Sequence, residues 1–286
     1  MAGKFARSWA LMKASAEILR SDKSLLMFPL MSGICTLVVA ATFLIPIGFS
    51  IVSDAHMREY VGEHGHSPIY YVLMFAFYLV QYTVIIFFNT ALASVALQRL
   101  RGETATVADG IAVAKSRLGI IIGYAVIAAT VGLLLRTLQE RLGLIGRFVV
   151  GWLGLAWTVA TFLVVPVLAS EEVGPLDAVQ RSVELLKRTW GENLIGNAGI
   201  GAVFGLIIFA AILVSALLMI SVAGSHSIVA TVTMGAIVLV GFILLGMIQS
   251  SLQGIYAAAL YRYAEEGEVG GGFDQAMLEQ AFRPKS

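Results

Sequence analysis

The side chains best suited to chemistry in this chain are histidines and carboxylates that lie together in one polar segment. His56, His64 and His66 share this segment with Glu59 and Glu63. The two glutamates are four residues apart, so a helical segment would place them on one face. Because imidazole and carboxylate groups are ligands of Zn²⁺ and related metals, the segment is a candidate metal site.

Two other interpretations of the histidine segment stand beside metal binding. Histidine is ordinary in a solvated loop, and no established metal motif such as His-Glu-x-x-His occurs here. Histidine also titrates near neutral pH, so the segment could sense pH. His226 lies in a different connection and would join the site only if the two connections met. We therefore predict no cofactor and keep metal binding as an alternative.

Polar residues inside long apolar stretches form a second candidate site. Gln81 and Asn89 lie in one stretch, and Gln249 and Gln253 lie in another. These amides could line a polar pathway for a small solute or a lipid. Their commoner role is hydrogen bonding between helices, at about 0.6–2 kcal/mol each. We favour this structural role, because no Asp, Glu or Lys lies deep in any stretch and ion-coupled transporters usually need one.

The sequence contains no recognisable catalytic motif. It has no serine nucleophile elbow, P-loop or dinucleotide-binding fingerprint. The single cysteine, Cys35, lies within an apolar stretch, where a thiol is usually inert. A formal net charge of +1 and the lack of a basic domain give no indication of nucleic-acid binding. We therefore predict a protein that is not an enzyme and binds no nucleic acid.

The composition indicates that lipid covers most of the chain. Hydrophobic residues make up 58% and charged residues only 13%, whereas soluble domains carry about 25% charged residues. A membrane span needs about 20 apolar residues and must satisfy its backbone internally, which predicts helices. The fold class is therefore an all-α membrane protein with six transmembrane helices. The predicted spans are residues 25–52, 69–97, 120–138, 148–169, 194–220 and 228–260.

Basic residues predict the orientation of the spans. Most of the 19 Lys and Arg residues fall in the N-terminal segment, in the connections after the second and fourth spans, and in the tail. Positive charge near span ends favours the cytoplasmic side. We therefore expect both termini in the cytoplasm of a prokaryotic cell and the protein in its plasma membrane.

The cytoplasmic segments predict an internal repeat. Amphipathic helices are expected at residues 4–23, 106–118 and 175–191, and each leads into a pair of spans. The run from Ser15 to Arg20 resembles the run from Ser182 to Lys187. The units are parallel, because each starts on the same side. They cover residues 1–97, 98–170 and 171–263, followed by a cytoplasmic tail, 264–286, with a short amphipathic helix at 273–282.

The amphipathic helices carry aromatic and basic residues that suit the lipid headgroup region. The expected interfacial anchors are Trp9, Trp190, Arg20, Lys187 and Arg188. The same pattern also fits helices that pack on the protein's own spans. In the fifth span, Gly201 and Gly205 form a small-residue motif for helix packing, either within the bundle or in a homo-oligomer.

Several short motifs resemble known membrane proteins. Pro166–Glu172, Gly174–Ala178 and Arg181-Ser182 resemble the membrane domain attached to some glycerophosphodiester phosphodiesterases. Phe5–Trp9 and Arg99–Glu103 resemble an uncharacterised prokaryotic family of six-span proteins, a domain of unknown function. The resemblance implies the six-span architecture and brings no activity. We see no counterpart of the phosphodiesterase catalytic barrel, so that chemistry is not carried over.

Three functional hypotheses follow from the sequence. The leading one is a non-enzymatic membrane protein that assembles with itself or a protein partner through its spans and cytoplasmic amphipathic helices. The second is a channel or carrier for a small solute or lipid, lined by the polar residues of the second and sixth spans. The third is a metal-dependent membrane enzyme that uses the external histidines. The lipid bilayer is the one partner common to all three.

Overall fold

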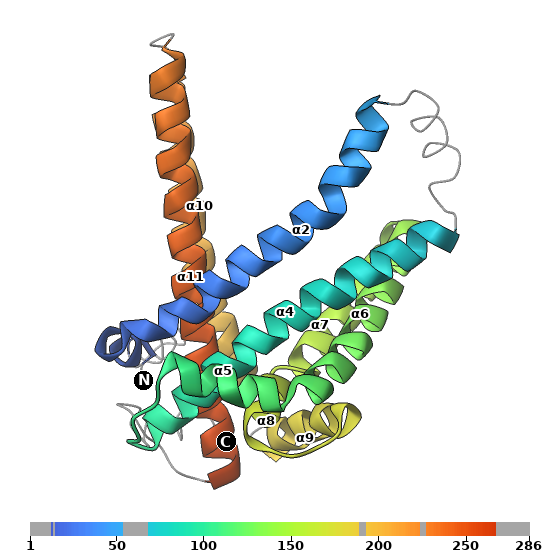
Figure 1. Ribbon diagram of the computed structural model, residues 1–286, viewed down its shortest axis with the longest axis vertical. Helices are drawn as coiled ribbons and strands as arrows, with labels where there is room; N and C mark the ends of the chain where they lie inside the picture. The colour runs from blue at the N-terminus through green and yellow to red at the C-terminus, as the bar shows by residue number, and fades with distance from the viewer. Residues whose placement is uncertain (1–12, 14, 54–67, 189–192, 224–226, 267–286) are drawn as a thin grey trace. The chain divides into compact units, whose positions relative to one another are not determined.

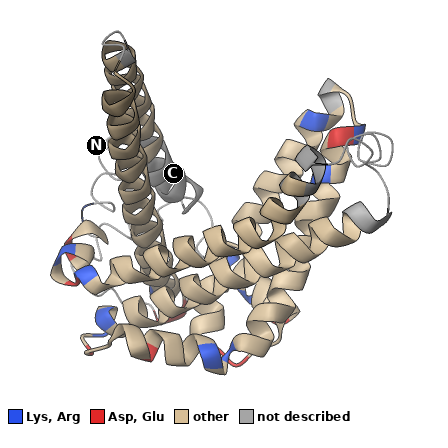
Figure 2. Ribbon diagram, turned by 45° about the horizontal axis from the view of Figure 1, so that its top comes forward, with Lys and Arg blue, Asp and Glu red and all other residues tan. Residues whose placement is uncertain are grey.

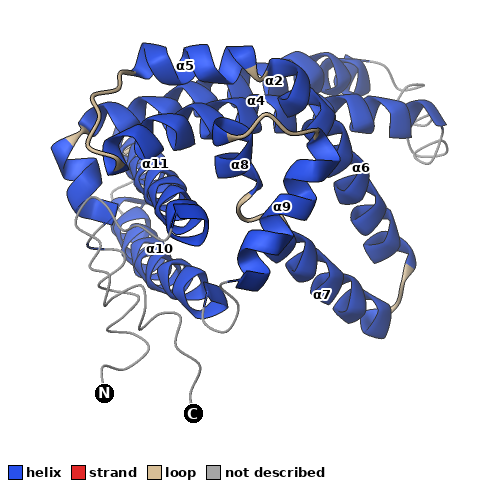
Figure 3. Cartoon of the chain, turned by 90° about the horizontal axis from the view of Figure 1, so that it is seen from below, coloured by secondary structure: helices blue, strands red, loops and turns tan. Residues whose placement is uncertain are grey.

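The computed structural model describes residues 13, 15–53, 68–188, 193–223 and 227–266, and all regular structure in these residues is helical (Figure 3). A helical segment at residues 15–21 precedes the first labelled element. The elements, shown in Figure 1, are η1 (Lys23–Leu26), α2 (Met27–Ser53), α4 (Pro68–Leu100), α5 (Val107–Ser116), α6 (Leu118–Arg141), α7 (Leu144–Ala160), α8 (Val164–Ser170), α9 (Pro175–Arg188), α10 (Asn193–Ala223) and α11 (Ile228–Glu266).

Six described stretches are helical, long and apolar enough to cross a membrane, as the sequence predicts. They correspond to η1 with α2, then α4, α6, α7 with α8, α10 and α11. Figure 2 shows that charged residues gather at helix ends and in connections, which leaves the middles of the long helices without charge. The chain is therefore a multi-pass membrane protein.

The fourth predicted span, 148–169, is not one continuous helix. It divides into α7 and α8, which are separated by a short turn at residues 161–163. Pro166 explains the break, because proline has no N–H and its ring clashes with the carbonyl of the residue four positions earlier. That residue, Phe162, lies within the turn.

Two of the segments predicted as amphipathic helices, 106–118 and 175–191, contain the helices α5 and α9. Thr106 begins α5 with a capping box: its hydroxyl accepts the Asp109 N–H at 3.3 Å, and its own N–H donates to the Asp109 carboxylate at 2.8 Å. The Thr106 hydroxyl also donates to the Asp109 carboxylate at 2.7 Å, and this bond together with the one from the Thr106 N–H lowers the pKa of the Asp109 carboxyl. Pro175 occupies the first position of α9, where its missing N–H costs no helical hydrogen bond.

The two segments that resemble each other in sequence are also buried alike. In each, the serine and the fourth and fifth residues are buried, whereas the glutamate and the final basic residue are exposed. The segments are residues 15–20 and 182–187. Half of the first predicted amphipathic helix, 4–23, and all of the tail helix, 273–282, lie outside the described residues.

The chain divides into two compact units. Unit 1 comprises Met1–Leu26, Ala96–Thr104 and Lys187–Ser286, and so contains α10 and α11. Unit 2 comprises Met27–Val95 and Ala105–Leu186, and so contains α2, most of α4, α5 to α8 and most of α9. Each unit is described separately below.

In unit 2, small residues allow close helix contacts. A Cβ placed on Gly110 of α5 would lie only 2.7 Å from the Ala91 carbonyl oxygen of α4. A Cβ on Gly123 of α6 would lie 2.5 Å from the ring of Pro175. The hairpin of α6 and α7 completes this unit, with the two helices side by side (Figure 1).

In unit 1, α10 packs along α11 (Figure 1). The less exposed residues of α10 recur every three or four positions, which is the period of a single helical stripe. They are Phe204, Ile208, Ala211, Ser215, Met219 and Val222. The rest of the described α10 surface is exposed, as is expected for a span that faces lipid or another helix.

Candidate functional site

All four histidines lie outside the described residues. His56, His64 and His66 lie within residues 54–67, and His226 lies within 224–226, both outside the described residues. Among the residues that the structure describes, no group of three or more His, Cys, Asp or Glu could hold a metal ion. The metal-binding interpretation of the histidines therefore stays a prediction.

The residues of the predicted polar pathway belong to both units, and each unit is described by itself. In unit 2, the Gln81 amide of α4 donates a hydrogen bond to the Thr36 carbonyl of α2 at 3.2 Å, which joins two spans. Asn89, also on α4, is half-buried. In unit 1, Gln249 and Gln253 of α11 are half-buried and have no hydrogen-bond partner among the described residues. The Gln81 bond is the structural role that the sequence favoured.

The predicted anchors and packing glycines are only partly described. Arg20 and Lys187 are exposed, and Arg188 is the last residue of α9, whereas Trp9 and Trp190 lie outside the described residues. A Cβ placed on Gly205 would meet no heavy atom within 4 Å. Gly205 is therefore not a close contact within the described chain. Gly201 lies on α10, and its packing role stays a prediction.

The break in the fourth span is held by a serine from another helix. Ser182 of α9 is fully buried, and its hydroxyl accepts the Leu163 N–H at 3.1 Å and donates to the Ala160 carbonyl at 2.7 Å. The Leu163 N–H lies in the turn between α7 and α8, and the Ala160 carbonyl directly precedes this turn. Because an unpaired backbone group in a membrane is costly, Ser182 replaces the hydrogen bonds that the break removes.

An arginine next to Ser182 ties α9 to the end of α8. The Arg181 guanidinium lies 3.4 Å from the Glu171 carboxylate and 3.5 Å from the Glu184 carboxylate. Arg181 and Ser182 both belong to the motif that resembles the membrane domain attached to some glycerophosphodiester phosphodiesterases. Sequence reasoning noted this motif for its resemblance but missed its local role, which is to fix the broken span.

A cluster of ion pairs lies at the ends of α4 and α11 in unit 1. Arg262 is almost fully buried, donates to the Glu266 carboxylate at 2.9 Å and also donates to the Leu100 carbonyl. Arg101 pairs with the same Glu266. The cluster brings the motif Arg99–Glu103 together with Arg262 and Glu266 of α11, a contact that the sequence did not predict.

A further ion pair in unit 1 joins Asp22, which directly precedes η1, to the end of α4. The Arg99 guanidinium lies 2.8 Å from the Asp22 carboxylate. Partial burial raises the pKa of Asp22, but hydrogen bonds from Ser24 and the Arg99 charge together lower it more. The pKa of the Asp22 carboxyl is therefore below its ordinary value, and Asp22 is ionised at neutral pH.

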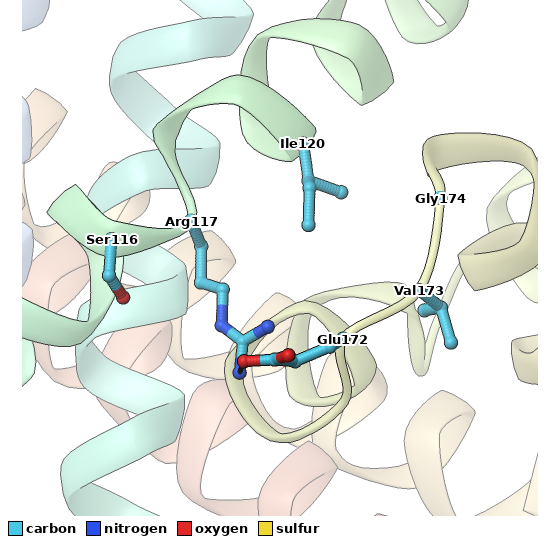
Figure 4. Close-up of a pocket in the computed structure, with 6 residues that line it drawn as sticks. All are labelled: Ser116, Arg117, Ile120, Glu172, Val173 and Gly174. Atoms are coloured by element: carbon cyan, nitrogen blue, oxygen red, sulfur yellow. Dashed lines mark ion pairs between the residues drawn. The ribbon is translucent and has the colours of Figure 1, made fainter.

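A pocket lies in unit 2, between the start of α6 and the segment that precedes α9 (Figure 4). Its volume is about 430 Å³. Arg117 and Glu172 form an ion pair there, with 3.4 Å between the guanidinium and the carboxylate. The lining residues are Ser116, Arg117, Ile120, Glu172, Val173 and Gly174. Sequence reasoning counted Arg117 only as a charge that orients the chain.

Most of the polar side chains described above hold neighbouring helices or turns together. The hydroxyl of Ser182 bonds backbone groups, and the guanidiniums of Arg181 and Arg262 pair with neighbouring carboxylates. The pocket at Arg117 is different, because it presents a cation, an anion and an apolar wall to the surroundings. Such a set can bind a charged amphiphile.

Comparisons with known proteins identify a family without a known activity. No match was found among curated proteins, and none among solved structures. A family of unknown function, DUF6159, matches residues 68–272, which run from the start of α4 to beyond the end of α11. This agrees with the predicted uncharacterised family and shows no link to glycerophosphodiester phosphodiesterases. Because the match covers more than half of the chain, the chain belongs to the family of unknown function DUF6159.

Proposed function

We propose that this protein is a non-enzymatic integral membrane protein that assembles with a second copy of itself through α11. The observation that best supports this proposal is a pair of side-chain amides on α11, those of Gln249 and Gln253. Both are half-buried, and neither has a hydrogen-bond partner among the described residues. They are four residues apart, so they share one face of the helix.

The membrane environment makes these amides strong association groups. An amide without a hydrogen-bond partner in hydrocarbon costs several kcal/mol. A facing helix that supplies Gln or Ser side chains removes this cost. A second α11 provides such groups, and two copies related by a twofold axis would satisfy each other.

The neighbouring span leaves room for such a partner. Apart from the stripe that packs on α11, the described surface of α10 is exposed. Gly205 has open space around it, so another helix could approach the backbone closely there. Only part of each of these two helices is buried: Gly110 and Ala114 in α5, and Ala178, Leu185 and Leu186 in α9, whereas Leu176 of α9 is 64% exposed. The outward faces of α5 and α9 therefore remain for a protein partner.

The cellular membrane and the orientation that we propose are inferred from the sequence. We place the protein in the prokaryotic plasma membrane with both termini in the cytoplasm, because the basic residues cluster on that side. The equal burial of residues 15–20 and 182–187 supports the parallel repeat. The likeness to the membrane domain of some glycerophosphodiester phosphodiesterases also stays a proposal.

The molar mass of the purified full chain in mild detergent tests the assembly. We expect wild type to be an oligomer and the double variant Gln249→Leu/Gln253→Leu to dissociate more readily. Interhelical hydrogen bonds contribute about 0.6–2 kcal/mol each, so the dissociation constant should rise roughly tenfold to several-hundredfold. Light scattering across a dilution series measures this constant.

Thr233→Val is the matched control, because Thr233 is exposed on the opposite face of α11. This variant should keep the wild-type dissociation constant. A wild-type chain that is monomeric at all concentrations would contradict the proposal, as would a double variant that assembles like wild type while retaining its helical circular dichroism.

The alternative function is a channel or carrier lined by Gln81, Asn89, Gln249 and Gln253. The Gln81 oxygen is buried and has no partner among the described residues, which is the one observation that favours a solute or water there. Reconstitution in liposomes separates the two functions. Release of a trapped small solute that Gln81→Leu abolishes would favour transport over assembly.

A further inference from the structure

The pocket at Arg117 lies where the ends of two spans meet. Arg117 directly precedes the span Leu118–Arg141, and Glu172 closely follows the span Gly146–Ser170. The span Leu118–Arg141 crosses the membrane, and the span Gly146–Ser170 crosses it in the opposite direction. Arg117 and Glu172 are therefore at the same membrane surface. Charged side chains at span ends lie at the depth of the lipid headgroups. The pocket is therefore open to headgroups.

Arg117 has unused hydrogen-bonding capacity. A guanidinium carries five N–H donors in a planar arrangement that suits phosphate. Among the described residues, its charged partner is Glu172 alone, at 3.4 Å, whereas Arg181 has two carboxylates nearby. The Arg117 side chain is only 16% exposed, so it is held in place, while that of Glu172 is 88% exposed and free to move.

An apolar wall continues from the pocket along α6. Ile120 lines the pocket, and Ile127 and Leu134 follow it at intervals of seven residues, which places all three on one side of the helix. Ile120 and Ile127 are partly exposed, and Leu134 is 58% exposed. An acyl chain could follow this side of α6 while its headgroup occupies the pocket.

We propose that this pocket binds a zwitterionic phospholipid with a primary ammonium group, such as an ethanolamine headgroup. The phosphodiester would lie on the Arg117 guanidinium, and the ammonium would donate hydrogen bonds to the Glu172 carboxylate. Figure 4 shows these two side chains next to each other, with Ile120 on the adjoining side. An anionic lipid would satisfy Arg117 but would leave Glu172 facing a like charge.

The experiment offers the full chain equal amounts of phosphatidylethanolamine, phosphatidylcholine and phosphatidylglycerol in mixed micelles, and measures the bound lipid by native mass spectrometry. Wild type should retain phosphatidylethanolamine in at least several-fold excess over each of the others. Phosphatidylcholine should bind less, because its quaternary ammonium has no N–H to donate to Glu172.

Three variants assign this preference to the pocket. Arg117→Gln should reduce bound phosphatidylethanolamine roughly tenfold, the loss expected for one charged hydrogen-bonding group. Glu172→Gln changes an exposed side chain and should leave the fold intact, but it should shift the preference toward phosphatidylglycerol. Lys115→Gln is the matched control, because it removes a nearby exposed cation that does not line the pocket.

Several outcomes would overturn the proposal. Equal binding of the three lipids by wild type, or a preference for phosphatidylglycerol, would exclude an ethanolamine site. An equal loss in Lys115→Gln and Arg117→Gln would show only a diffuse surface charge. Displacement of the lipid by equimolar soluble glycerophosphoethanolamine would show that the headgroup alone is bound and that the apolar wall has no role.

Discussion

At the scale of single residues, the most informative side chain is a serine that the sequence alone would class as ordinary. Ser182 is buried and bonds both the Leu163 N–H and the Ala160 carbonyl. These backbone groups cannot bond within a helix, because the turn at 161–163 separates α7 from α8. One hydroxyl thus stabilises an interrupted membrane span by satisfying two backbone groups at once.

We expect Ser182→Ala to destabilise the protein by about 1–3 kcal/mol, since the substitution leaves a buried donor and acceptor unpaired. Thermal unfolding in detergent, followed by circular dichroism, measures this loss. The control is Ser221→Ala, because the exposed Ser221 hydroxyl bonds only the Leu218 carbonyl of its own helix. A Ser182→Ala protein as stable as this control would show that water or relaxation satisfies the break.

At the scale of elements, the approach of α5 to α4 depends on the absence of a side chain. Gly110 lies so close to α4 that a Cβ would be 2.7 Å from both the Ala91 oxygen and a Val95 methyl group. Such distances are well below van der Waals contact, and backbone atoms cannot move aside as a flexible side chain can. The small residue therefore sets the separation of the two helices.

We expect Gly110→Ala to destabilise the protein, although alanine favours a helix over glycine by about 1 kcal/mol. The steric cost of overpacking, about 1–3 kcal/mol, exceeds this gain, because the nearest atom belongs to the backbone. Gly119→Ala on α6 is the control, since no heavy atom lies near its Cβ, and it should be neutral or slightly stabilising. Chemical denaturation compares the two, and equal stability would refute the close contact.

At the scale of the whole molecule, the six spans predict an alternating exposure of the connections. Lys115 precedes the span that starts at Leu118, and Gly143 follows its end at Arg141. These two residues should therefore lie on opposite sides of the membrane. The excess of basic residues near Lys115 predicts that its side is the cytoplasm.

Labelling of single cysteines tests this topology. Cys35 is the one cysteine of the chain, so Cys35→Ser supplies a thiol-free background. In intact cells, a membrane-impermeant maleimide should label Gly143→Cys but not Lys115→Cys. Permeabilised cells should show labelling of both variants. Labelling of Lys115→Cys in intact cells, with Gly143→Cys protected, would reverse the predicted orientation.

The sequence by itself determined which segments are helical and which are apolar enough to span a membrane. These properties are local, because about 20 consecutive apolar residues force a helix in lipid whatever the neighbours are. The spacing of apolar residues likewise predicted α5 and α9. The histidines and the tail helix lie outside the described residues, so the predictions about them still depend on the sequence alone.

Only the tertiary structure decided what the polar residues do. Ser182, Gly110 and Arg117 have ordinary residue types, and their roles depend on neighbours that are remote in the chain. Pro166 explains why the fourth span is interrupted, but its position does not predict that a serine from α9 would bond the interrupted backbone. Arg117 and Glu172 meet because the hairpin of α6 and α7 returns the chain to the same surface. Pairings of this kind follow from packing, which local patterns do not encode.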